Sequence, residues 1–178
     1  MRDYSDQILM DRRDKQRVSK FNIFVLLLVP LAAILFQVYV PMFFKPLAYL
    51  ELPVLVTVYF SLTKQHQIAG TLAGAAIGLA QDSLADHPLG MFGIVKTLVG
   101  YFASSLSMRF DVEHPGLRFL VGFFFFFFHE LLYWVLTSAL LGNEGSFALV
   151  RTLLAGALNA MVAVPLFALL DKLRVKTS

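Results

Sequence analysis

Long apolar runs alternate with short polar connections along most of the chain. A helix that crosses a bilayer needs about 20 mostly apolar residues, because about 30 Å of hydrocarbon is crossed at about 1.5 Å per residue. Six segments meet or approach this length, which predicts an all-α fold, a polytopic bundle of six transmembrane helices. The predicted helices span residues 21–40, 47–62, 68–80, 89–107, 117–141 and 147–170.

One short helix and one proline-bounded turn stand out in this pattern. The third predicted helix, residues 68–80, is short for a full crossing, since it would rise only about 20 Å. We still predict that it crosses, because an even number of helices is needed if both chain ends lie on one side of the membrane. Between the first two helices, Pro41 and Pro46 predict a tight turn.

The distribution of basic residues predicts how the helices are oriented. Cytoplasmic connections of membrane proteins carry an excess of Lys and Arg. With the amino terminus inside, 12 of the 15 Lys and Arg residues fall in cytoplasmic segments. The opposite side receives Lys45 and Arg151, and Lys96 lies within the fourth helix. Both termini of this multi-pass membrane protein are therefore predicted to be cytoplasmic.

Composition supports the membrane assignment and removes several classes of function. Of 178 residues, 58% are hydrophobic and 15% charged, more apolar surface than a soluble domain of this length covers. The net charge is +3, but the basic residues are dispersed between apolar runs, so we predict no nucleic-acid partner. The chain lacks cysteine, which excludes thiolate ligands and disulfides. We divide it into a charged segment (1–20), a membrane domain (21–170) and a basic tail (171–178).

Small residues recur at helical spacing on the third and fourth predicted helices. They are Gly70, Gly74 and Gly78 on the third helix, and Gly93, Gly100 and Ser104 on the fourth. Such faces let two helices approach closely. We expect the two helices to pack on each other, and the alternative is that a partner's helix docks there.

Ionisable residues inside apolar helices are costly and are candidates for function. Lys96 lies on the fourth predicted helix, and His129 and Glu130 lie on the fifth. Glu130 could pair with Lys96 or Arg151, or stay protonated, and we favour a structural pair over a proton or ion relay. No second ligand accompanies His129 at helical spacing, so no metal site is predicted. Asn159 is expected to form a hydrogen bond across helices.

The connection between the third and fourth helices, residues 81–90, combines two carboxylates, a histidine, a proline and a glycine. Paired acids are typical of hydrolases, but no nucleophile with an orienting partner, phosphate-binding loop or metal-ligand spacing accompanies them. We therefore expect neither an enzyme nor a cofactor. The simpler interpretation is that Asp86 caps the fourth helix and Pro88 occupies its first turn.

This same region resembles the MreD family of rod shape-determining membrane proteins. The resemblance lies in the sequence Gly78-Leu79-Ala80-Gln81-Asp82-Ser83-Leu84, then Pro88-Leu89-Gly90-Met91, then Lys96-Thr97-Leu98-Val99-Gly100-Tyr101. The positions that carry over are Asp82, Pro88, Gly90 and Gly100. Chain length, helix number and predicted topology agree with the family along nearly the whole chain.

The resemblance implies a non-catalytic scaffold of the bacterial cell-elongation complex. Such a protein binds MreC and helps couple MreB filaments to peptidoglycan synthesis by RodA and its class B penicillin-binding protein, and so maintains cell shape. MreD-like proteins are also similar in fold to the substrate-binding subunits of energy-coupling-factor transporters. The alternative is therefore a membrane subunit of such a vitamin transporter, in which case adjacent paired ATPase genes are expected.

Overall fold

The computed structural model describes residues 21–64, 66–85, 90–108, 114–142 and 145–174, and these residues are predominantly helical. The helices are α2 (Ile23–Phe43), η1 (Lys45–Tyr49, a 3₁₀ helix), α3 (Leu52–Lys64), α4 (Gln67–Leu84), α5 (Met91–Ser107), α6 (Pro115–Leu141) and α7 (Leu149–Asp171). The predicted all-α class with six α-helices is confirmed for the described part of the chain.

The outer surface of the bundle is strongly apolar. Four segments are long and apolar enough to cross a membrane: Ile23–Phe43, Lys45–Thr63, Pro115–Leu141 and Leu149–Asp171. Helix α5 is a shorter apolar helix. On α2, large side chains stand far out of the bundle, with Phe24 67% and Met42 75% exposed. Exposed apolar surface on this scale calls for a lipid environment, so the chain is an integral membrane protein.

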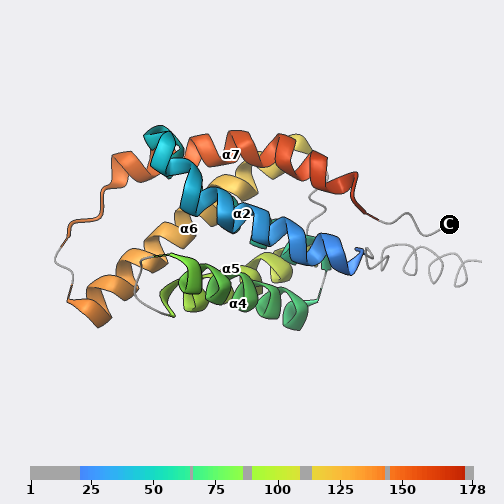
Figure 1. Ribbon diagram of the computed structural model, residues 1–178, viewed down its shortest axis with the longest axis horizontal. Helices are drawn as coiled ribbons and strands as arrows, with labels where there is room; N and C mark the ends of the chain where they lie inside the picture. Colours follow the sequence, from blue (N-terminus) through green and yellow to red (C-terminus); the bar gives the residue numbers. More distant parts are fainter. Residues whose placement is uncertain (1–20, 65, 86–89, 109–113, 143–144, 175–178) are drawn as a thin grey trace, which may run out of the picture.

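Helix α3 is the centre of the bundle, since it contacts all five other α-helices. Its side chains are buried on every face, including Val54, Leu55, Val58 and Phe60 at 0% exposure. A helix that is hydrophobic all round is expected in such a position. Around it, α4 and α5 lie side by side on one side of the bundle, and α7 lies on the other (Figure 1).

Three element boundaries differ from the prediction. Helix α2 continues through Pro41 to Phe43, because Pro41 lies in the last turn and the Phe44 N–H still bonds to the Val40 carbonyl (3.0 Å). The second predicted helix is divided, since residues 45–49 form η1 before α3 begins. The third is longer than 13 residues: α4 has 18 residues, about 27 Å.

The two ends of the described chain meet at one end of the bundle. Phe21 and Arg174 form an isolated antiparallel bridge. The start of α2 and the end of α7 both lie on the right of Figure 1. Beside the bridge, Asp171 Oδ1 accepts a hydrogen bond from Tyr59 Oη (2.9 Å) and lies 2.8 Å from Arg174 Nη2. Asp171 Oδ2 accepts from Arg118 Nη2 (2.5 Å). We call Tyr59, Arg118, Asp171 and Arg174 the basal cluster. It ties α3, α6 and α7 together where α2 begins.

Candidate functional site

The six small residues singled out in the sequence come together where α4 packs on α5, which is the most extensive helix contact in the bundle. We call Gly70, Gly74 and Gly78 with Gly93, Gly100 and Ser104 the small-residue interface. Of these, the three glycines of α4 lie directly against α5. A Cβ atom on Gly74 would overlap the Lys96 carbonyl oxygen, and one on Gly78 would overlap that of Phe92. The space is therefore filled by the chain's own backbone.

Hydroxyl groups along this interface are bonded within the chain. Ser104 Oγ donates to the Gly100 carbonyl (2.8 Å), and Thr97 Oγ1 donates to the Gly93 carbonyl (2.6 Å). Ser61 Oγ of α3 reaches the Gly70 carbonyl at 3.5 Å. Polar side chains that bond back to helical carbonyls cost little in an apolar environment. The small-residue interface is thus an internal packing surface of α4, α5 and α3.

Asp82 closes the α4–α5 pair at the end where the two helices connect. It is 3% exposed, and its carboxylate accepts from the backbone N–H groups of Phe92 (3.1 Å) and Gly93 (2.8 Å). These are unpaired donors of the first turn of α5, and a carboxylate is also favoured by the positive end of the helix dipole. Asp82 lies in the last turn of α4 and caps the first turn of α5.

The cap predicted from the sequence involves residues that the structure does not describe. Asp86 and Pro88 fall outside the described residues, so their predicted roles stay predictions. Gly90 is the N-cap residue of α5 and has φ of 90°, a left-handed conformation that favours glycine. The sequence did contain a signal for Asp82, a carboxylate in the last turn of an otherwise apolar helix.

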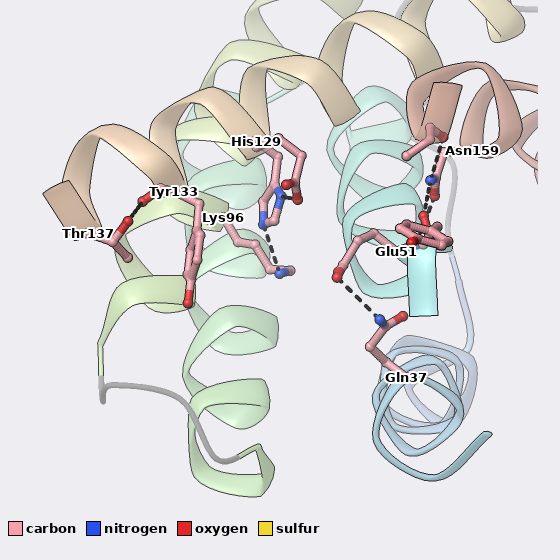
Figure 2. A network of polar contacts seen from close by, with 10 residues as sticks. Gln37, Glu51, Lys96, His129, Tyr133, Thr137 and Asn159 are labelled. Carbon is pink, nitrogen blue, oxygen red and sulfur yellow. Dashed lines mark hydrogen bonds and ion pairs between the residues drawn. The ribbon is translucent and has the colours of Figure 1, made fainter. Parts of the chain in front are cut away.

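Lys96 and His129 form the middle of a buried polar network (Figure 2). Lys96 is 0% exposed; its Nζ lies 3.4 Å from His129 Nε2 and 4.3 Å from the centroid of the Phe92 ring. His129 Nδ1 lies 3.4 Å from Glu130 Oε1. A lysine ammonium only donates, so His129 Nε2 accepts and its proton sits on Nδ1, facing Glu130.

This arrangement changes the pairing expected for Glu130. His129 stands between Lys96 and Glu130, so the acidic and basic side chains are linked through the imidazole instead of forming a direct pair. Arg151, the other expected partner, places its guanidinium over the ring of Tyr49, 4.8 Å from the centroid. The rotation of each helix about its axis decides these pairings, and the sequence does not specify that rotation.

Glu51 completes the polar network and was missed by the sequence analysis. Its Oε1 accepts from Gln37 Nε2 (3.2 Å), and Glu51 and Lys96 point toward one another from the start of α3 and from α5 (Figure 2). We call Gln37, Glu51, Lys96, His129 and Glu130 the polar network. Glu51 is a single carboxylate in an apolar segment, the same signal that singled out Glu130.

Asn159 of α7 anchors the backbone beside Glu51. Its Oδ1 accepts from the Glu51 N–H (2.8 Å), and its Nδ2 donates to the carbonyls of Tyr49 (2.7 Å) and Ala155 (2.9 Å). The expected bond across helices is therefore present, and it reaches the η1–α3 connection. One buried amide satisfies backbone groups of an irregular segment, which would otherwise be costly within a membrane protein.

The chemistry of the site is that of a buried structural network. Glu51 and Glu130 stand at its two ends with Lys96 and His129 between them, and the four residues come from the start of α3, from α5 and from α6. Within the described ranges, no group of three or more His, Cys, Asp or Glu side chains is placed to hold a metal ion.

Comparison with protein families matches residues 18–174 to the family model described as rod shape-determining protein MreD. Comparison with curated proteins and with solved structures gives no match. The family match includes all of α2 to α7, and so contains both the small-residue interface and the polar network.

Proposed function

We propose, from the premise that this chain belongs to the MreD family of rod shape-determining proteins, that it is a non-catalytic scaffold of the cell-elongation complex. In this proposal the chain binds MreC and helps couple MreB filaments to peptidoglycan synthesis by RodA and its class B penicillin-binding protein. The single observation that carries the proposal is the family match along residues 18–174.

The contacts of the buried ionisable side chains lie within the bundle, which supports a scaffold. Lys96, His129 and Glu130 contact one another across α5 and α6, and Asp82 is held by two backbone N–H groups. Lys96 and His129 join α5 to α6, and Asp82 joins α4 to α5. A protein that acts by surface fit needs a rigid bundle of this kind and no turnover.

The partner's helix is proposed to bind an outer face of the bundle, because the small-residue interface is occupied by α5. Large apolar side chains stand outward on several helices, for example Leu31 on α2, Leu72 on α4 and Phe124 on α6. Photo-crosslinking residues placed singly at these three positions would identify the face that MreC contacts. Crosslinks confined to one helix are expected.

The main experiment is co-purification of MreC with the tagged chain from membranes in mild detergent. Enrichment of MreC over an unrelated tagged membrane protein is the expected result. A correctly folded chain that recovers no more MreC than this control would contradict the proposal. The alternative transporter function predicts paired ATPases in the same preparation.

The proposed topology is multi-pass in the bacterial inner membrane, with both termini in the cytoplasm. The meeting of Phe21 and Arg174 at one end of the bundle supports it. The chain has no cysteine, so single-cysteine variants can be labelled without background. Phe44→Cys, at the opposite end of α2, is expected to react with an impermeant maleimide from outside, and Met108→Cys is not. Equal labelling of the two would contradict this orientation.

A further inference from the structure

An open groove lies between η1 and the first half of α7, and it encloses about 770 Å³. The two elements are in contact, and η1 lies beside the beginning of α7 in Figure 1. The described lining residues are Tyr49, Ala148, Leu149, Val150, Arg151, Leu154, Ala155 and Leu158. All of them except Arg151 are uncharged, and most are aliphatic.

Arg151 supplies a positive charge at the mouth of this groove. It is exposed, and its guanidinium is held over the Tyr49 ring. No carboxylate of the described residues lies within ion-pair distance of it. Arg151 acts on Glu130 electrostatically but forms no ion pair with it, and Glu130 Oε1 lies 3.4 Å from His129 Nδ1. Among the described residues, no carboxylate therefore competes with an external anion for the Arg151 donors.

The order of residues along α7 places the charge and the apolar wall at different depths. Arg151, Leu154, Ala155 and Leu158 are spaced by three and four residues, so they share one face of the helix. Arg151 lies in the first turn, and Leu158 lies about 10 Å further along the axis. Trp134, whose Nε1 donates to the Gly145 carbonyl (2.7 Å), lies near the same end, where interfacial aromatics are expected. The groove thus runs from interfacial depth into the hydrocarbon.

The groove walls are fixed relative to each other. Asn159 Nδ2 donates to the Tyr49 carbonyl and to the Ala155 carbonyl, which joins one wall to the other. The Arg151–Tyr49 stacking also restricts the guanidinium. A site that is already formed loses little conformational freedom when it is occupied.

We propose that this groove binds a phospholipid with an anionic headgroup, with the phosphate at Arg151 and an acyl chain along Leu154 and Leu158. The positive charge of Arg151 distinguishes between the possible occupants of the groove. A free phosphate would leave the apolar wall unused, and an apolar partner helix would cover the Arg151 charge without compensating it. An anionic lipid matches both parts, since guanidinium binds phosphate through paired hydrogen bonds and the acyl chain covers the aliphatic surface.

The test uses the full-length chain in detergent, with phosphatidylglycerol and phosphatidylcholine of identical acyl chains as probes. Native mass spectrometry counts bound lipid, and thermal unfolding measures stabilisation. Phosphatidylglycerol is expected to be retained and to raise the unfolding temperature more than phosphatidylcholine does. Arg151→Gln is expected to weaken phosphatidylglycerol retention about tenfold, the effect of losing one charge-assisted contact.

Two further variants make the result specific. Arg151→Lys keeps the charge and is expected to retain most of the preference for phosphatidylglycerol. Lys45→Gln removes another basic residue near this end of the bundle, outside the groove lining, and is expected to change nothing. The proposal is overturned if wild-type protein binds both lipids equally, if Arg151→Gln keeps the preference, or if Lys45→Gln loses it as fully. None of these measurements involves MreC, so the outcome is independent of the scaffold proposal.

Discussion

Replacing Gly74 by leucine tests whether the small-residue interface holds the bundle together. The first atom of the new side chain would already overlap the Lys96 carbonyl oxygen, and it would lie 2.8 Å from the Lys96 carbonyl carbon and 3.2 Å from the Thr97 nitrogen. These are backbone atoms of a helix, so they cannot move aside as a flexible side chain would. Helices α4 and α5 must separate.

The expected magnitude follows from two opposing terms. Leucine has a better helix propensity than glycine, which favours the variant by about 1 kcal/mol. Overpacking costs about 1–3 kcal/mol at a single well-packed site, and a gap of about 0.5–1 Å forfeits a quarter to a half of each dispersion contact along the interface. The cost extends along all of α4 and α5, so we expect a net loss of about 1–3 kcal/mol in the free energy of unfolding.

The assay is reversible unfolding of the purified chain in mixed micelles, followed by circular dichroism. Ala76→Leu is the matched control, because it adds leucine to an exposed position of the same helix. It is expected to change stability by less than about 0.5 kcal/mol. The reasoning is refuted if Gly74→Leu is as stable as Ala76→Leu. If it is equally stable yet no longer recovers MreC, the interface is a docking surface.

Three further predictions concern charged side chains that join helices. Asp82→Ala removes the cap of α5 and is expected to cost about 1–2 kcal/mol in the same unfolding assay, whereas Ser83→Ala, one residue later and exposed, should be nearly neutral. Lys96→Met leaves Glu51 without its facing cation and is expected to cost about 3–5 kcal/mol; adding Glu51→Gln should recover part of this loss, and strict additivity in the double-mutant cycle would contradict the coupling. Asp171→Asn weakens the basal cluster and should lower stability by about 1–3 kcal/mol, with a loss that shrinks at high salt because the cluster is partly exposed. A salt-independent loss would indicate a packing defect instead.

The fold class could be predicted because long apolar segments have few alternatives in a membrane. Helices α6 and α7 begin and end within two residues of the predicted bounds, since polar residues stop the apolar run on both sides. The η1–α3 break was not predictable in this way. It depends on Asn159, 108 residues away from Glu51, bonding the irregular backbone.

The sequence identified most residues of the candidate site but did not identify which of them contact each other. Glycines four residues apart mark a face that accepts a close neighbour, and the structure supplies the neighbour, α5. Lys96, His129 and Glu130 stood out because charges are rare in apolar helices. Their order in the polar network was not predictable, because a rotation of α6 by one residue, about 100°, would point His129 away from Lys96.

The bridge between Phe21 and Arg174 has a mechanical consequence. Because α2 and α7 leave the described bundle as neighbours, and Arg174 is also joined to Asp171, we expect tension on either helix to be shared by both and passed to the interior through Tyr59. The domain is therefore expected to respond to a pull as one unit and not to come apart helix by helix from one end.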